Sequence, residues 1–142
     1  MKIFFIIIKI LFIYSFLISS GVAKESNYFK KGIELFQKKE FDKSKILFER
    51  DLVFNPRSEK SYLFLAKIFE KDENDEEQEH NLNNVLLLNP INDEAIYMLT
   101  LLKIKQSNYE EAKELIDKFT LVCKSFCSKE TEIKNKFNKL TP

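Results

Sequence analysis

A short segment that ends in Asn-Pro occurs twice in this chain of 142 residues. Residues 52–56 read Leu-Val-Phe-Asn-Pro and residues 86–90 read Leu-Leu-Leu-Asn-Pro, so Pro56 and Pro90 lie 34 residues apart. A fixed period of this length is typical of helical repeat arrays, in which each unit buries an apolar face against the next. Proline also ends a helix, because it lacks the backbone N–H and clashes with the preceding turn. With only 2 Gly and 3 Pro, the sequence predicts stacked helices rather than a turn-rich sheet.

The residues that precede each proline recur in the same register. The first period carries Tyr28, Gly32, Leu35, Ser44 and Phe48, the second Tyr62, Ala66, Phe69, Gln78 and Leu82, and a third Ile96, Leu99, Lys103, Ala112 and Ile116. In this pattern the chain resembles the tetratricopeptide repeat across residues 24–126, with repeats at about 25–58, 59–92 and 93–126. The resemblance implies an all-α, right-handed superhelical array of about three helix–turn–helix repeats.

The repeat register also predicts where the helices lie. They are expected at about 26–38, 42–54, 58–71, 75–88, 93–105, 109–122 and 128–140. The last of these lies in the segment 127–142, which we expect to form a C-terminal capping helix and tail, because a terminal repeat would otherwise expose its apolar face. The residues that define the repeats are Tyr28, Gly32, Phe48, Pro56, Tyr62, Leu65, Ala66, Phe69, Pro90, Leu99, Tyr109 and Ala112.

Some positions depart from the family pattern. Asp51 and Gln78 replace the small residues expected at helix crossings, which predicts looser packing there. Lys103 stands where an aromatic residue is usual, and Lys124 stands where the third repeat would have its closing proline.

In the family, the first helix of each repeat lines a concave groove that binds other proteins. By resemblance, the groove residues of this chain are Phe29, Ile33, Phe36, Phe64, Lys67, Lys71, Tyr97, Leu101, Ile104 and Lys105. A clamp for a C-terminal carboxylate needs Lys and Asn in the first repeat, where this chain has Phe29 and Ile33. The apolar groove therefore favours an amphipathic helix or an extended apolar peptide as partner. Two alternatives are that segment 128–140 fills the groove, or that two chains pair through it.

Residues 1–23 differ from the rest of the chain. Lys2 precedes the mainly apolar segment 3–18, and the small residues Gly21 and Ala23 follow it. This order is typical of a secretory signal peptide. The apolar segment is also shorter than the ~20 residues that a helix needs to cross a bilayer. We therefore expect a signal peptide at 1–23 and an exported protein, periplasmic or secreted. The alternative is an uncleaved segment that anchors the chain in the membrane.

The sequence offers little for catalysis. His80 is the only histidine, and 2 glycines are too few for a phosphate-binding loop. We predict a protein that is not an enzyme, with no catalytic residue, no metal and no cofactor. The 23 basic and 22 acidic residues nearly balance, which argues against nucleic acid as a partner.

Cys123 and Cys127 are the only cysteines. They lack the second pair that a zinc site would need. In an oxidising compartment two nearby cysteines tend to form a disulfide, and the sequence leaves open both this bond and two free thiols.

Together these features predict a non-catalytic adaptor or scaffold of the cell envelope or secreted space that binds a protein segment in an apolar groove. The alternative is a structural scaffold that is tethered to the membrane or associates with itself.

Overall fold

The computed structural model describes residues 25–140, so the expected signal peptide at 1–23 lies outside the described residues. Within that range the chain forms seven α-helices and one short 3₁₀-helix, η1. They are α2 (Asn27–Gln37), α3 (Phe41–Phe54), α4 (Glu59–Lys71), α5 (Asp75–Leu88), α6 (Asp93–Lys105), α7 (Tyr109–Val122), η1 (Cys127–Lys129) and α8 (Glu130–Leu140). Each predicted helix begins and ends within one residue of the observed one, except that η1 delays the start of α8.

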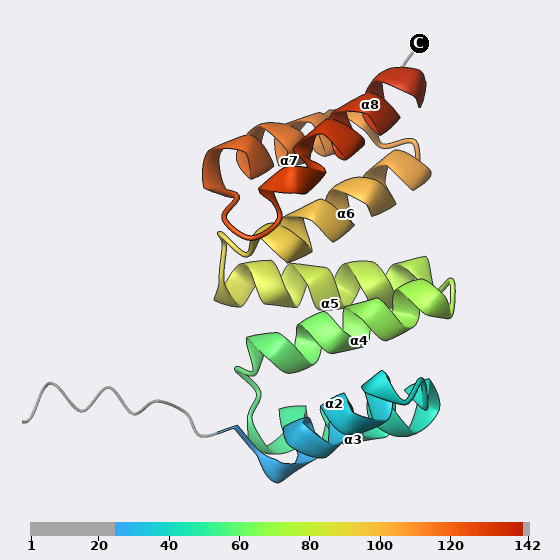
Figure 1. The fold of residues 1–142 in the computed structure, drawn as a ribbon, viewed down its shortest axis with the longest axis vertical. Coiled ribbons are helices and arrows are strands. Elements are labelled where there is room, and N and C mark those ends of the chain that lie inside the picture. Colours follow the sequence, from blue (N-terminus) through green and yellow to red (C-terminus); the bar gives the residue numbers. More distant parts are fainter. Residues whose placement is uncertain (1–24, 141–142) are drawn as a thin grey trace, which may run out of the picture.

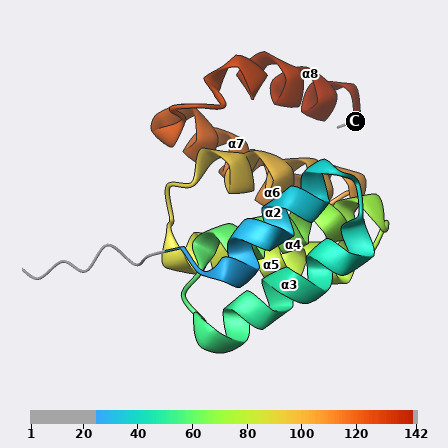
Figure 2. The ribbon, with the colours of Figure 1, turned by 60° about the horizontal axis from the view of Figure 1, so that its bottom comes forward.

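The helices stack as three consecutive hairpins, α2–α3, α4–α5 and α6–α7, along the long axis of the molecule (Figure 1). Successive hairpins touch through the second helix of one and the first helix of the next. The last helix, α8, packs on both α6 and α7 and closes the array, as Figure 2 shows from another direction. The predicted all-α repeat architecture with a capping helix is confirmed.

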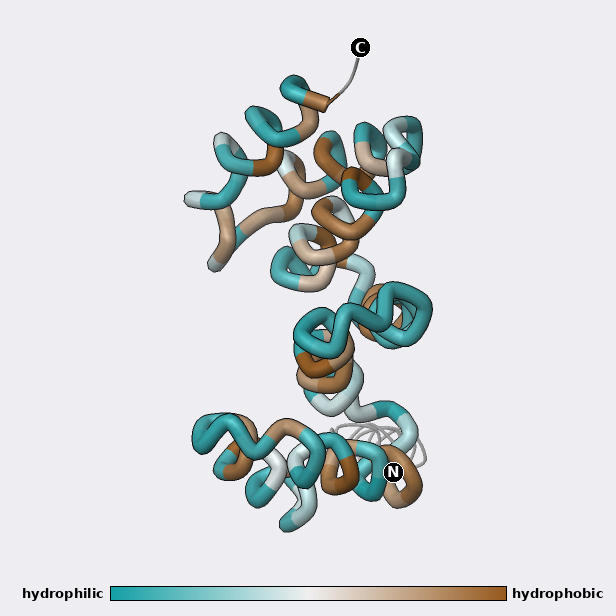
Figure 3. The backbone as a smooth tube through the Cα atoms, turned by 90° about the vertical axis from the view of Figure 1, so that its right-hand side faces the viewer, coloured by the Kyte–Doolittle hydropathy of each residue, from teal (hydrophilic) through white to brown (hydrophobic). Residues whose placement is uncertain are grey.

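Buried apolar side chains from successive helices pack against one another. Hydrophobic and hydrophilic residues alternate along the helices of the backbone trace (Figure 3). The buried residues fall into two clusters. The smaller cluster joins the first hairpin to α4 through Phe29, Phe48, Leu65 and Ile68. The larger cluster runs from α4 through α7 and ends on Ile133 of α8, which is fully buried.

The turn inside each hairpin places one residue in the left-handed backbone region. These residues are Lys39 (φ 62°), Glu73 (φ 54°) and Ser107 (φ 60°), and they occupy the same position of the 34-residue period. The next backbone N–H in each case bonds back to a carbonyl five residues earlier, which closes the first helix of the hairpin. Glycine is the residue that adopts this conformation without steric cost, and none of the three positions has one.

Two helices cross closely in the first hairpin. A Cβ atom on Gly32 of α2 would come within 2.7 Å of Cε1 of Phe48 on α3. The backbones are also joined by the Ser44 hydroxyl, which donates to the Gly32 carbonyl at 2.8 Å. Gly32 is therefore required by the approach of α3 and not by a turn.

Asp51 does not loosen the first repeat, contrary to the sequence prediction. Its side chain is fully buried, and its two carboxylate oxygens accept hydrogen bonds from the Ser26 and Ser61 hydroxyls. Ser26 also caps α2 by accepting from the Phe29 N–H at 3.0 Å. Asp51 thus ties the start of α2 and the first turn of α4 to α3.

Lys103 has a structural role that explains its departure from the aromatic pattern. Its ammonium group lies 2.6 Å from Glu79 of α5 and 2.9 Å from Glu111 of α7, and its side chain is 7% exposed. Burial lowers the pKa of Lys103, but hydrogen bonds to the two carboxylates outweigh this and hold its pKa above the usual value. The ion pairs link the second and third repeats.

Candidate functional site

The first helices of the repeats form one face of the array, and a groove runs along this face. A hollow of about 350 Å³ lies between α4 and α6, with Phe36 of α2 at one side. The residues that line it are Phe36, Lys67, Glu70, Lys71, Glu94, Tyr97, Met98, Leu101 and Phe126.

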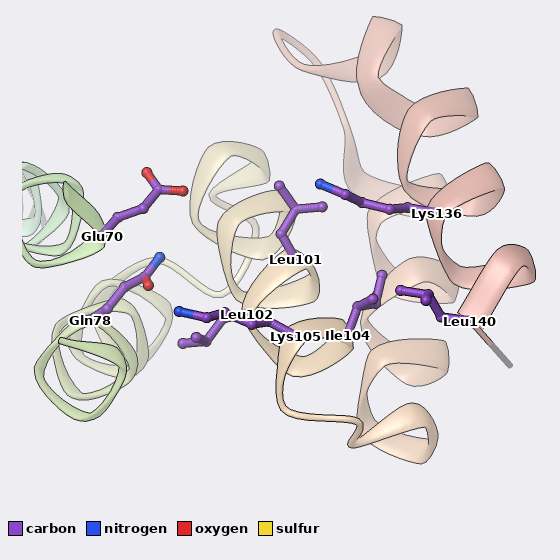
Figure 4. A pocket seen from close by; sticks show the side chains of 8 residues that line it. All are labelled: Glu70, Gln78, Leu101, Leu102, Ile104, Lys105, Lys136 and Leu140. Carbon is purple, nitrogen blue, oxygen red and sulfur yellow. The ribbon is translucent and has the colours of Figure 1, made fainter. Parts of the chain in front are cut away.

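A second hollow of about 320 Å³ continues the groove toward the C-terminus. It is lined by Glu70, Gln78, Leu101, Leu102, Ile104, Lys105, Lys136 and Leu140 (Figure 4). In this view Leu101 of α6 lies between Glu70 of α4 on one side and Lys136 of α8 on the other. Because Glu70 and Leu101 line both hollows, the two form one groove.

The structure places seven of the ten predicted groove residues on these walls. They are Phe36, Lys67, Lys71, Tyr97, Leu101, Ile104 and Lys105. Ile104 is 3% exposed and forms part of the floor. On α4 and α6, six of the seven residues that the sequence register selects therefore lie on the walls of these hollows.

The other three predicted groove residues, Phe29, Ile33 and Phe64, line neither hollow, and this part of the prediction needs correction. Phe29 is 3% exposed, and Ile33 packs against the same buried cluster. The Phe64 ring stacks on Phe48 at 5.1 Å between centroids. The physical reason is that the aromatic side chains of α2 and α4 turn toward each other to fill the junction between the first two repeats.

Some of the charges on the groove walls are paired within the chain. Lys67 of α4 pairs with Glu94 of α6 at 2.7 Å, and its ammonium group also lies 5.0 Å from the centroid of the Phe64 ring. Lys105 pairs with Asp75 at 2.6 Å. These two pairs neutralise part of the charge on walls that also carry the apolar side chains of Tyr97 and Leu101.

Tyr97 lies on the wall formed by α6. Its ring lies 5.9 Å from that of Phe126, and its hydroxyl donates to Glu132 of α8 at 2.9 Å. Burial, assisted by the neighbouring Glu132 carboxylate, raises the pKa of Tyr97 to about 12. Tyr97 therefore stays neutral at physiological pH and presents an aromatic surface to the groove.

The C-terminal helix narrows the groove without filling it. Lys136 and Leu140 of α8 line the second hollow, and Ile133 is buried against α6 and α7. Phe126, Lys136 and Leu140 were not predicted as groove residues, because the resemblance assigns the groove to the first helix of each repeat and these residues follow the third repeat's second helix. The apolar spacing of α8 was the available signal, and it indicated a cap.

The loop between α7 and α8 is held at two points. Cys123 and Cys127 form a disulfide with their Cα atoms 5.2 Å apart. The Asp93 carboxylate accepts hydrogen bonds from the backbone N–H groups of residues 124–126, at 2.7, 2.6 and 2.9 Å. Partial burial acts to raise the pKa of Asp93, but these hydrogen bonds outweigh it and hold the pKa below its usual value.

A second apolar surface lies outside the groove. Val53, Leu87 and Leu121 are 76%, 80% and 85% exposed, and they occupy the same position near the ends of α3, α5 and α7. We call these three residues the outer stripe. The three residues lie 34 positions apart, so the repeat period contained a signal for this stripe.

Within residues 25–140 no group of His, Cys, Asp or Glu side chains is arranged to hold a metal ion. None of the helices in the same part of the chain combines the length and apolar character needed to span a membrane.

The array is similar to several solved structures. It superimposes on the first TPR of Spaghetti (RPAP3) bound to the HSP90 peptide SRMEEVD with a TM-score of 0.71 and 15% identity, over 84% of this chain and 98% of that one. The chain has the tetratricopeptide-repeat fold. The tetratricopeptide-repeat domains of a Plasmodium falciparum FK506-binding protein and of Sgt2 from Aspergillus fumigatus each give a TM-score of 0.66. Their identities are 21% and 18%, with 80% and 79% of this chain and 83% and 78% of theirs covered.

No protein-family profile matches the sequence, and no curated protein matches it either. At these identities the likeness shows the tetratricopeptide-repeat fold and does not carry over the partner of any neighbour.

Proposed function

We propose that this tetratricopeptide-repeat protein is a non-catalytic interaction module that binds an apolar segment of another protein in the groove along α4, α6 and α8. The observation that carries the proposal is the groove itself, which has apolar walls and is covered by no other part of residues 25–140. A similar domain has been solved with a bound peptide, which supports the use of this fold for peptide binding.

The chemistry of the walls favours an apolar partner over an acidic one. Of the four lysines on the groove walls, Lys67 and Lys105 are already paired with Glu94 and Asp75. The ammonium group of a third, Lys71, lies 5.2 Å from the centroid of the Phe41 ring. An amphipathic helix that inserts aliphatic side chains beside Leu101 would fit these walls without separating the ion pairs.

A substitution at Leu101 tests this proposal. Leu101→Glu places a carboxylate between the two hollows, and burying that charge without a partner costs several kcal/mol, more than most interface side chains contribute. Leu87→Glu is the matched control, because it makes the same chemical change on the exposed outer stripe. We expect crosslinking from the native cell to recover the partner with the Leu87 variant and to lose it with the Leu101 variant. Recovery with both variants, at unchanged helical content, contradicts the proposal.

We also propose that the protein is exported and works in the periplasm or outside the cell, on the basis of the signal-like residues 1–23. The mature chain then begins at or near Lys24. Mass spectrometry of the N-terminus of the native protein checks this, and an intact Met1 would instead favour the membrane-anchored alternative.

A second candidate function is a self-associating scaffold, and the outer stripe is the observation that favours it. Three aliphatic side chains that are each more than three-quarters exposed recur once per repeat, and a second chain that covered them would remove this apolar surface from water. If the stripe joins two chains, light scattering will find a dimer for the wild type and a monomer for Val53→Glu/Leu87→Glu/Leu121→Glu. A monomeric wild type at micromolar concentration excludes this candidate.

A further inference from the structure

The loop that follows α7 ends the third repeat without the proline that closes the first two. The first two repeats close with Pro56 and Pro90, whereas the third has Lys124 at that position. Here the chain turns from Val122, the end of α7, into η1 and then α8, and the Cys123–Cys127 disulfide closes this turn. The bond therefore fixes the path by which the chain enters the capping helix.

The same loop supplies one wall of the groove. Phe126 lies inside the five-residue segment that the disulfide closes, lines the first hollow, and packs its ring on Tyr97. The Asp93 carboxylate holds the backbone N–H of Phe126 at 2.9 Å. Beyond the loop, α8 adds Lys136 and Leu140 to the second hollow. Both hollows thus depend on where this loop lies.

We propose that the groove is complete only while Cys123 and Cys127 are joined, so that binding of the partner depends on the redox state of this disulfide. In the reduced chain the loop opens more often, Phe126 leaves Tyr97, and α8 detaches with it. This inference rests on the proposed function for the existence of a partner, but the opening of the loop can be measured without one.

The reaction is thiol–disulfide exchange with a dithiol reductant, either a small molecule or a protein. One thiolate of the reductant attacks a sulfur of the disulfide and forms a mixed disulfide. The second thiol of the reductant, as its thiolate, then attacks the reductant's own sulfur in this mixed disulfide and frees the protein thiol. The bond between the Sγ atoms of Cys123 and Cys127 breaks, both residues gain a proton to become thiols, and the two sulfurs of the reductant become joined. Cys127 is exposed and Cys123 half-buried, which gives the attacking thiolate access.

The size of the effect follows from the short ring. A disulfide between residues with a sequence separation of 4 restricts the open loop modestly. The chain-entropy relation for a ring of this length gives an increase of about 20- to 30-fold in the open population on reduction. The contacts of Phe126 and Asp93 stay available in the reduced chain, so we expect a shift in population and not a lost fold.

Hydrogen exchange of the full-length chain tests the proposal, with and without dithiothreitol. The cysteines of the loop are the only two in the sequence, so the reductant has no other disulfide to break. We expect the amides of residues 124–126 and of α8 to exchange about 20- to 30-fold faster after reduction, and those of α2–α5 to stay unchanged. The matched variant Cys123→Ser/Cys127→Ser should exchange like the reduced wild type in both buffers.

Two results of the hydrogen-exchange experiment would overturn the inference. One is a change of less than about threefold in the exchange of residues 124–140 on reduction, an order of magnitude below the expected effect. The other is a serine variant that is as well protected as the oxidised wild type.

Capture of the partner separates this inference from the proposed function. Oxidised wild type should recover the crosslinked partner, and reduced wild type and the serine variant should recover much less. If reduction opens the loop but leaves capture unchanged, the redox dependence is wrong and the proposed function stands. If Leu101→Glu still captures the partner, the proposed function is wrong, and the exchange rates alone decide whether the loop is redox-sensitive.

Discussion

Replacing Gly32 with Ala sets two opposing effects against each other, and the structure decides which is larger. Alanine is better than glycine inside a helix by about 1 kcal/mol. The added Cβ, however, would lie 2.7, 3.0 and 3.1 Å from three carbon atoms of the Phe48 ring, where a normal carbon–carbon contact is ~3.5–4.0 Å. The ring cannot retreat easily, because Phe48 is fully buried and Phe64 stacks on its face at 5.1 Å.

Overpacking of a buried site costs about 1–3 kcal/mol, so Gly32→Ala should destabilise the protein by up to about 2 kcal/mol after the helical gain is subtracted. For a domain of this size that is a fall of up to roughly 10 °C in the melting temperature. Thermal and urea unfolding followed by circular dichroism measure it. Lys31→Ala, at the exposed neighbouring position of α2, is the control and should leave the melting temperature nearly unchanged.

A second substitution identifies the cause. With Phe48→Leu the ring is gone, and adding Gly32→Ala to that background should be neutral or stabilising by up to about 1 kcal/mol, the helical gain alone. A Gly32→Ala protein that melts at or above the wild-type temperature with Phe48 in place would refute the steric argument.

Other predictions concern the left-handed turns, the buried Asp51 carboxylate, the capping helix and the stability at low pH. Glu73→Gly and Ser107→Gly should each stabilise the protein by up to about 1 kcal/mol, because they relieve left-handed backbone, and an unchanged urea midpoint contradicts this. Asp51→Ala should cost about 2 kcal/mol or more, because it leaves two hydroxyls without their acceptor, and Asp51→Asn should cost less. Deleting residues 128–142 should lower the melting temperature by exposing the third repeat, whereas an equal melt would show that the segment is a tail. The pKa of Asp93 is lowered in the folded protein, so its contribution to stability is present above about pH 4 and is lost as the pH falls through its folded value. Asp93→Asn should reduce the dependence of the unfolding free energy on pH between pH 2 and about pH 4, measured in an acid titration.

The sequence alone determined the period and the helices. The pair Pro56 and Pro90 sets the length of the repeat, and the spacing of apolar residues within it sets which side of a helix is buried. These are local properties, which is why helix boundaries were predicted to within one residue for α2–α7 and why Leu101 and Tyr97, selected by the repeat register, both line the first hollow.

Properties that depend on contacts between distant segments appeared only in the tertiary structure. In the sequence Asp51 is only a polar residue at a helix crossing. In the structure it accepts hydrogen bonds from the hydroxyls of Ser26 and Ser61, which lie 25 and 10 residues away. Lys103 likewise finds its carboxylates on α5 and α7. A one-dimensional pattern gives the direction of a side chain relative to its own helix, but it does not say which side chains of other helices meet it.

The left-handed turns illustrate a further limit. Lys39, Glu73 and Ser107 carry no glycine signal, and their conformation is imposed by the hydrogen bonds that end each first helix. Phe29 and Phe64 show the same limit at the functional site. Their position in the repeat indicated the groove. Both rings instead pack in the space between the first two repeats, and this space exists only once the hairpins stack. Local periodicity therefore determined the array, and the packing of one hairpin on the next decided which of its apolar residues a partner can reach.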